Sequence, residues 1–145
     1  MKARELMTEN PRVCGPGDTA QAALAIMRDE DCGVVPITEG NGQLRVVGVV
    51  TDRDIALYLG QKDERPSEVR LANVMTPRAI SVEPNADVDD VERRMQEGQV
   101  RRILVCENGR LLGVISTADL ARSAKTKETG RVIEKISEPN AGSSR

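Results

Sequence analysis

An internal repeat constrains the fold of this 145-residue chain more than any other feature of its sequence. The dipeptide that begins at Met7 recurs at Met75, an offset of 68 residues. Beyond a turn that is three residues shorter in the second copy, the offset becomes 65, and Asp54 recurs as Asp119. Chance coincidences would not keep register through one short length change. The chain therefore contains two copies of one unit in tandem.

Each copy is expected to form a strand, a helix, two strands and a second helix, from its aliphatic runs and its helical spacing of apolar residues. One unit is too small to bury both faces of its sheet, so the two should pack about a pseudo-twofold axis. The predicted fold class is mixed α/β (α+β), with two tandem βαββα units. The predicted domain limits are 1–74 for the first unit with its lead-in and linker, 75–125 for the second, and 126–145 for a short helix and a disordered tail.

An aspartate precedes the first helix of each copy, where its side-chain oxygen can accept from the free N–H groups of the first turn. We therefore expect Asp18 and Asp87 to cap these helices. The other predicted elements are the short extended segments Arg12–Cys14 and Ile80–Val82 and the closing helices Asp52–Leu59 and Thr117–Ala124.

Composition excludes several classes of function. The chain has no His, Trp or Phe, and Tyr58 is its single aromatic residue. Without His there is no Ser-His or Cys-His dyad and no imidazole zinc site, so we expect neither an enzyme nor a metal site. A formal net charge of −2 and a lone aromatic ring argue against nucleic-acid binding.

Other features predict the cellular setting. No apolar run approaches the roughly 18 residues of a membrane span, and the N-terminus lacks the apolar stretch of a secretory signal. The three cysteines, Cys14, Cys32 and Cys106, are widely spaced and odd in number, which is typical of small buried side chains in a reducing compartment. We therefore expect a cytoplasmic protein with no membrane partner.

The sharpest local signal is a hydroxyl residue followed three positions later by Asp, where a buried strand turns into a helix. It occurs as Thr51 to Asp54 and as Ser116 to Asp119. In a structural interpretation, the pair forms a capping box. In a functional one, the carboxylate accepts from two ribose hydroxyls while the hydroxyl and the helix N-terminus face phosphate. The residues alone leave both interpretations open.

The doubled pattern resembles a cystathionine-β-synthase (CBS) domain pair, also called a Bateman module. The resemblance covers about residues 4–125 and rests on G-V-V-P-I and L-R-V-V-G-V-V-T-D-R-D-I in the first copy, and on V-M-T-P-R-A-I-S-V-E-P, V-R-R-I-L-V and G-R-L-L-G-V-I-S-T-A-D-L in the second. It implies a stand-alone regulatory module that binds AMP, ADP, ATP or S-adenosylmethionine between its units. These would be regulatory ligands, and no cofactor is required.

The same resemblance implies roles for individual residues. Asp54 and Asp119 would hold ribose hydroxyls, with Thr51 and Ser116 near the phosphates. Backbone and apolar atoms of two short segments would recognise adenine, namely Arg12-Val13 and Ile80-Ser81.

Three arginines are candidates for phosphate, because Arg forms forked charge-assisted hydrogen bonds. They are Arg53, Arg101 and Arg102, and only one of the last two is expected to contribute, since neighbouring strand residues point to opposite faces.

The two copies differ where a ligand would bind. Val13 stands where Ser81 lies in the second copy, and Ala118 is the counterpart of Arg53. These differences favour the second site for ribose and base, with Arg53 available for phosphate. The resemblance further implies a homodimer and an unidentified downstream protein. The alternative is an interaction or stress-response protein with the same fold, in which the two turns are only helix caps.

Overall fold

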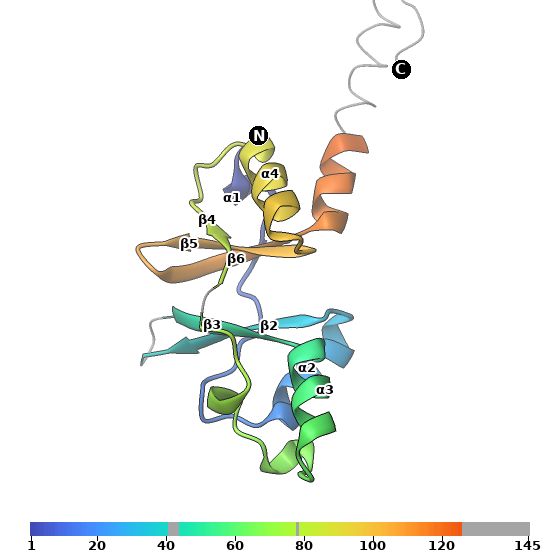
Figure 1. The fold of residues 1–145 in the computed structure, drawn as a ribbon. Helices are drawn as coiled ribbons and strands as arrows, with labels where there is room; N and C mark the ends of the chain where they lie inside the picture. The colour runs from blue at the N-terminus through green and yellow to red at the C-terminus, as the bar shows by residue number, and fades with distance from the viewer. Residues whose placement is uncertain (41–43, 78, 126–145) are drawn as a thin grey trace, which may run out of the picture.

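The repeat folds into two matching halves whose β-sheets face each other, with helices on the outer sides (Figure 1). A computed structural model of the chain describes residues 1–40, 44–77 and 79–125. The first half contains α2 (Ala20–Glu30), β2 (Val34–Glu39), β3 (Arg45–Thr51) and α3 (Asp52–Gln61). The second half contains β4 (Ser81–Val82), α4 (Val88–Gly98), β5 (Arg102–Glu107), β6 (Arg110–Ser116) and a closing helix over residues 117–125.

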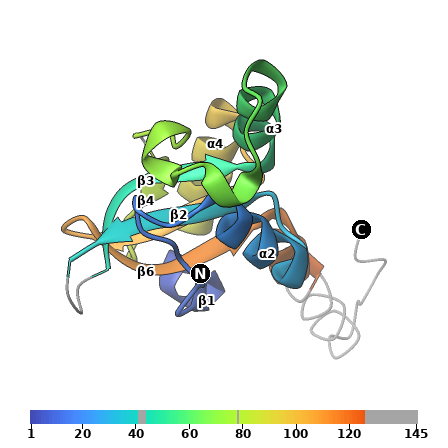
Figure 2. The same cartoon turned by 90° about the horizontal axis from the view of Figure 1, so that it is seen from below.

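An antiparallel hairpin forms the centre of each half. Strands β2 and β3 pair in the first half and β5 and β6 in the second, each with one irregularity, after Ile37 and after Val105. The overall strand order is β2-β3-β6-β5-β4, and the hairpins join where Arg45 pairs with Arg110. Seen from below, the hairpins overlap (Figure 2). The mixed α/β fold with two repeated units is confirmed.

The opening strands are shorter than the sequence predicts. In the second half only Ser81–Val82 forms a strand, parallel to β5. In the first half Cys14 alone makes the equivalent parallel bridge, to Ile37.

The predicted caps of the first helices are wrong at Asp18 and incomplete at Asp87. The cap of α2 is Thr19, whose hydroxyl accepts the Ala22 N–H at 3.2 Å. Asp18 instead accepts the Gly15 N–H at 2.7 Å, because the preceding turn folds back on it. Asp87 occupies the cap position of α4, but its carboxylate makes no capping bond and pairs with Lys2 at 2.8 Å.

Three apolar clusters hold the molecule together. One lies between α2, α3 and the first hairpin, and a second lies between α4 and the second hairpin. The third lies between the two hairpins, where Leu104 and Val114 of the second half meet Val46 and Val49 of the first. This third cluster joins the two halves, because its residues come from both of them.

The two halves exchange their lead-in segments. The first lead-in (residues 1–9) contains α1 (Ala3–Leu6) and β1 (Thr8–Glu9), yet Ala3 is fully buried in the second half. Figure 1 shows α1 beside α4. The second lead-in (residues 69–77) contains η2 (Leu71–Asn73), which follows η1 (Pro66–Glu68), and Leu71 is fully buried in the first half. Each segment therefore completes the core of the other half.

Hydrogen bonds repeat this exchange about the pseudo-twofold axis. Ala3 donates its N–H to the Ala86 carbonyl at 2.8 Å, and Leu71, its counterpart, donates to the Asp18 carbonyl at 2.9 Å. Further along, Thr8 pairs with Val114 of β6, and Thr76 pairs with Val49 of β3. The equal spacing of these contacts identifies the exchange as part of the repeat.

Two glycines make room for the exchanged segments. A Cβ on Gly48 would collide with the Thr76 carbonyl oxygen, and a Cβ on Gly113 would lie 2.7 Å from the Thr8 carbonyl oxygen. Both obstacles are backbone atoms, which cannot rotate away. The repeated glycine therefore follows from the close passage of a lead-in over β3 and β6.

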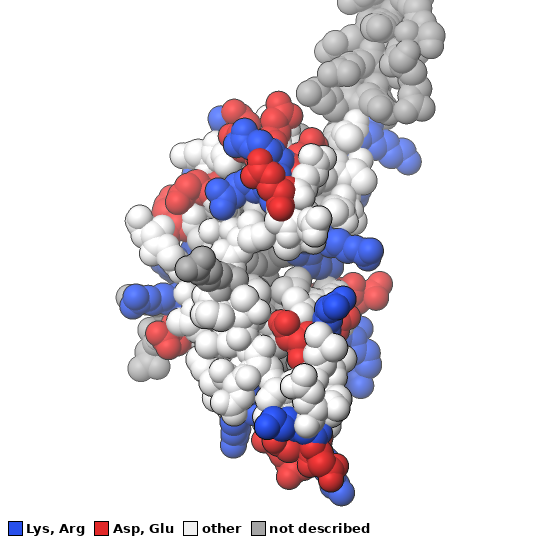
Figure 3. All heavy atoms as spheres, viewed as in Figure 1, with Lys and Arg blue, Asp and Glu red and all other residues white. Residues whose placement is uncertain are grey.

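Charges on the face in Figure 3 are mixed in sign. Acidic and basic side chains lie close together over α4, where Arg93 pairs with Asp90 at 2.9 Å. This face offers no broad basic patch of the kind that duplex binding needs.

Two further sequence predictions concern the C-terminal segment and membrane-spanning helices. The short helix and disordered tail expected for 126–145 lie outside the described residues. Within those residues, no helix combines the length and the apolar character that a membrane crossing requires.

We predict that Gly48→Ala or Gly113→Ala destabilises the protein by about 1–3 kcal/mol, because the added methyl group forces a lead-in off its strand. Chemical denaturation measures this change. Gly60→Ala in α3 is the matched control, since its Cβ meets nothing within 4 Å, and Ala in a helix is favoured by about 0.5–1 kcal/mol. Equal stability of all three variants would contradict the prediction.

Candidate functional site

The first hydroxyl–carboxylate turn forms where β3 runs into α3. Thr51 is the cap of α3: its hydroxyl accepts the Asp54 N–H, and Asp54 Oδ2 accepts the Thr51 N–H, both at 3.0 Å. The capping box therefore exists. It commits one carboxylate oxygen of the half-buried Asp54, and within the described part of the chain no hydrogen bond reaches the other oxygen, Oδ1.

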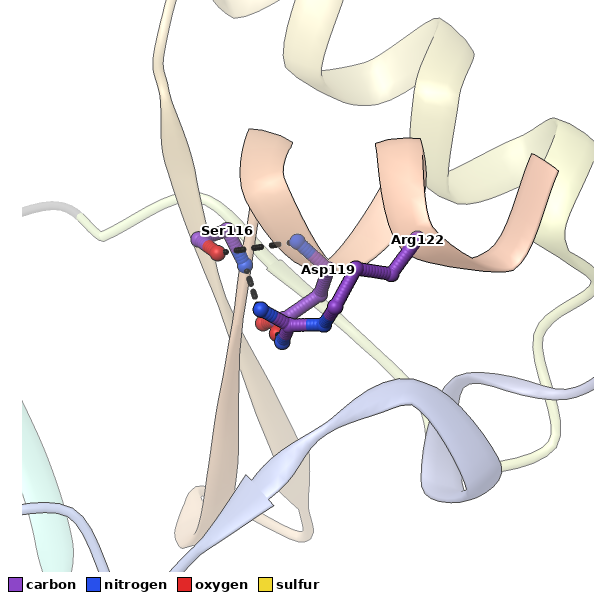
Figure 4. Close-up of polar contacts among 3 residues, drawn as sticks. All are labelled: Ser116, Asp119 and Arg122. Carbon is purple, nitrogen blue, oxygen red and sulfur yellow. Dashed lines mark hydrogen bonds and ion pairs between the residues drawn. The ribbon is translucent and has the colours of Figure 1, made fainter. Parts of the chain in front are cut away.

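The second turn repeats this geometry and adds a cation. Ser116 Oγ accepts the Asp119 N–H at 3.2 Å, and Asp119 Oδ2 accepts the Ser116 N–H at 2.8 Å. The other oxygen, Oδ1, accepts from Nη2 of Arg122 (Figure 4). Asp119 is buried, with 9% of its side chain exposed. The two turns are thus alike in backbone and different in the surroundings of the carboxylate.

Strand pairing brings both turns to one cavity. Thr51 pairs with Val34 across the first hairpin, and Ser116 pairs with Arg102 across the second. Val34 and Arg102 are repeat counterparts, and both line a cavity of about 200 Å³ between the halves. Each turn is therefore one strand away from the cavity wall.

The cavity is lined by both halves and by the first lead-in. Its walls are mostly apolar, with a few polar groups. The lining residues are Thr8, Asn10, Pro11, Arg12, Ile26, Glu30, Cys32, Val34, Pro36, Arg102, Leu104 and Val114.

Only two of the predicted site residues line this cavity, Arg12 and Arg102. Val13 packs against the cluster between the hairpins, and Ile80 packs against the core of the second half. Ser81 is half-buried and pairs with Leu104. These three residues are therefore placed for packing, and their part in adenine recognition stays a prediction.

Of the predicted arginines, Arg12 and Arg102 differ in whether the guanidinium already forms an ion pair. Arg12 donates to Asp29 at 3.1 Å, and this hydrogen bond lowers the pKa of the Asp29 carboxyl. Arg102 is half-buried and forms no ion pair with any residue that the structure describes. A phosphate would therefore compete with a carboxylate for Arg12 but not for Arg102.

The other two arginines lie elsewhere. Arg101 is exposed and outside the cavity lining, which agrees with the alternation of strand residues. Arg53 is exposed at the start of α3, where its N–H donates to Asp52 at 2.8 Å. Neither is brought to the cavity, and their roles toward phosphate are untested.

Sequence reasoning missed several lining residues, among them Thr8, Asn10 and Cys32. Thr8 reaches the cavity through the lead-in exchange, which carries the first lead-in to β6, and Asn10 directly follows that lead-in. Cys32 lies between α2 and β2. The repeat of Met7-Thr8 as Met75-Thr76 could have indicated Thr8, because it shows that the repeated unit begins upstream of the first predicted strand.

The described residues offer no metal site. Between residues 1 and 125, apart from 41–43 and 78, no three His, Cys, Asp or Glu side chains gather closely enough to hold a metal ion. The available chemistry is hydrogen bonding by two carboxylates and charge pairing by arginine, in a mostly apolar cleft.

Comparison with known proteins agrees with the repeat. A sequence model of the CBS domain matches residues 3–61 and 71–125. The uncharacterized protein YlbB of Bacillus subtilis is 36% identical over 138 residues, which cover 94% of this chain and 92% of that protein.

Solved structures agree as well. Hypoxic Response Protein I with two coordinated zinc ions has a TM-score of 0.74 and 31% identity, covering 84% of this chain and 98% of that one. CBSX2 in complex with AMP has a TM-score of 0.74 and 25% identity, covering 88% and 98%. CBS-pair proteins are generally regulatory and not catalytic modules. The chain belongs to the CBS domain family and carries one pair of CBS domains.

Proposed function

We propose that this CBS pair is a regulatory sensor that binds an adenosine-containing ligand, AMP, ADP, ATP or S-adenosylmethionine, in the cleft between its halves. One observation carries the proposal: strand pairing sets both hydroxyl–carboxylate turns beside a cavity that is also lined by Arg102, which has no ion pair among the described residues. The related structure of CBSX2 with AMP supports the same ligand class.

The ribose is assigned to the carboxylates. Two neighbouring hydroxyl groups of a ribose donate two hydrogen bonds, and an ionised carboxylate is an acceptor with two oxygens. Asp54 meets this need because its capping bond occupies only Oδ2. The capping box also orients the carboxylate, so capping and ligand binding are compatible in one residue.

The phosphate is assigned to Arg102, supported by Arg12 and Arg53. Arg102 is the only one of these three that lines the cavity without an ion pair among the described residues. Removing a half-buried guanidinium from water is offset when a phosphate supplies a charge-assisted partner. The N-terminus of α3, which Thr51 caps, adds a weaker attraction for anions.

The adenine is assigned to aliphatic walls and backbone groups. Tyr58 is the single aromatic residue and is not part of the lining, so no ring stacks on the base there. Pro36, Leu104 and Val114 supply apolar contact instead. The cavity of about 200 Å³ is smaller than the roughly 300–1,000 Å³ of typical ligand sites. A nucleotide would therefore extend from it toward a turn, or widen it.

Signalling would follow from the position of the ligand between the halves. A ligand that contacts both halves stabilises the arrangement that it fits, by no more than its difference in affinity for the two arrangements. We expect the output to be a change of conformation or of homodimer equilibrium, read by an unidentified downstream protein. We propose no catalysis, because the chain has no His and the lining has no carboxylate pair.

A second candidate function is an interaction or stress-response protein without a nucleotide site. The complete capping boxes favour it, since each of their four hydrogen bonds is internal. It predicts that Asp→Ala at either turn lowers stability by about 0.5–2 kcal/mol and changes no ligand response.

We predict that AMP, ATP or S-adenosylmethionine binds the purified protein and that Asp54→Ala or Asp119→Ala weakens this binding about 10- to 100-fold at the altered site. The loss corresponds to about 1.5–3 kcal/mol for a hydrogen bond to a charged group. Titration calorimetry measures affinity, and light scattering on the same samples measures the mass of the assembly.

Asp52→Ala is the matched control, because Asp52 lies in the same first turn but is exposed, and its carboxylate accepts only the Arg53 N–H among the described residues. Absence of binding to wild type, or equal binding by all variants, would remove the proposal and leave the interaction protein.

We predict that Arg102→Ala weakens AMP binding about 10-fold and changes adenosine binding little, because only AMP carries the phosphate that Arg102 would meet. Arg101→Ala is the matched control, one residue away, exposed and outside the cavity. Calorimetry of wild type and the two variants with both ligands gives six affinities. A larger effect from Arg101→Ala would place the phosphate elsewhere.

We predict that iodoacetamide modifies Cys32 first and that bound ligand slows this reaction several-fold. Cys32 is half-buried and lines the cavity. Cys106 is the internal control: burial raises its pKa to about 11, so at pH 8 it stays almost fully protonated and unreactive. Peptide mass spectrometry follows each thiol. An unchanged Cys32 rate at saturating ligand would place the ligand away from this cavity.

A further inference from the structure

The second turn differs from the first by a cation on the carboxylate. Arg122 lies one turn along the helix from Asp119 and donates to its Oδ1, the oxygen that the capping box leaves open (Figure 4). Both oxygens of Asp119 are therefore engaged in the ligand-free protein. A ribose that binds this carboxylate has to displace the guanidinium or share an oxygen with it.

The first turn has no such contact. At the repeat offset of 65, the counterpart of Arg122 is Leu57, whose side chain cannot donate a hydrogen bond. Leu57 is 58% exposed and leaves the half-buried Asp54 with one oxygen open. Asp119, by contrast, has only 9% of its side chain exposed. The repeat thus supplies its own comparison of a carboxylate with and without a guanidinium.

The Arg122 side chain is free to move. It is 73% exposed, so its displacement disturbs no core packing. Breaking such a pair lowers affinity by about two- to fivefold, the range of i,i+3 and surface ion pairs, because water replaces Asp119 around the exposed guanidinium. The cost differs between ligands, however, because the displaced guanidinium finds a new partner only where the ligand itself carries an anion.

We propose that Arg122 determines ligand specificity at the second site, admitting adenosine ligands that carry phosphate and disfavouring uncharged or cationic ones. The inference rests on the proposed function and adds a charge requirement to it. When a ribose hydroxyl replaces Arg122 at Asp119 Oδ1, the phosphate of the same ligand accepts hydrogen bonds from the displaced guanidinium. Adenosine, or the sulfonium of S-adenosylmethionine, leaves the guanidinium without a partner. Ala118 supplies no second cation in the first turn of this helix, which makes Arg122 the residue that decides.

The test isolates the second site with Asp54→Ala and compares this protein with Asp54→Ala/Arg122→Leu. Calorimetry with AMP and with adenosine gives two affinities for each protein. We expect Arg122→Leu to strengthen adenosine binding about two- to fivefold and to weaken AMP binding by a similar factor. The AMP preference then falls about four- to 25-fold. If both proteins bind AMP and adenosine with the same ratio of affinities, the inference about Arg122 is wrong and the proposed function still stands.

The reverse exchange is the matched variant. With the second site removed by Asp119→Ala, Leu57→Arg should give the first site the same preference for AMP over adenosine. Arg93→Leu is the control, because it removes an exposed arginine from α4 whose ion pairs are with Asp90 and Glu97 and not with a carboxylate of either turn. An altered preference in Arg93→Leu would overturn the inference as a general charge effect.

A second measurement needs no ligand. Carbodiimide coupling of glycinamide, followed by peptide mass spectrometry, reports the accessibility of each carboxylate. We expect Asp119 to be labelled more slowly than Asp54 in wild type and to approach Asp54 in Arg122→Leu. Unchanged labelling overturns the inference. If Arg122→Leu increases the labelling of Asp119 but no adenosine compound binds any variant, the proposed function is wrong. The role of Arg122 in ligand specificity is then wrong as well.

Discussion

The passage of each lead-in across the central strand of the opposite half is the contact on which the molecule depends. Thr8 pairs with β6 and Thr76 with β3, and the approach is so close that only glycine fits beneath, at Gly113 and Gly48. The exchange places Ala3 and Leu71 in cores formed by the other half. Neither half has a complete core without the lead-in of the other, so the two halves form one structure.

This exchange also builds the cavity. One wall is the first lead-in with residues 10–12, and the others come from α2, β2, β5 and β6, so a ligand there would contact both repeats at once. Such a site is suited to regulation because any change in the relation of the halves alters its shape. The apolar cluster between the hairpins shares Leu104 and Val114 with the cavity wall, so packing between the halves and the shape of the cavity depend on the same side chains.

Duplication made the two turns alike, and later substitutions made them different. The reciprocal hydrogen bonds of the capping box are the same in both, within a few tenths of an ångström. The charges around them are not: Arg53 has the counterpart Ala118, and Arg122 has the counterpart Leu57. The capping box thus explains the shared backbone geometry of the two turns, while the exposed positions near each carboxylate differ in charge.

The sequence by itself determined the repeat, the fold class and the position of both turns, because these depend on local periodicity and on residues a few positions apart. It did not determine the cap of α2, since Thr19 and Asp18 are both good caps and the turn at Gly15 decided between them. Only the tertiary structure decided the lead-in exchange, and only the side-chain direction showed that Arg122, three positions after Asp119, meets the oxygen that the capping box leaves open. Long-range packing and side-chain direction settle such features, and neither leaves a periodic trace in the chain.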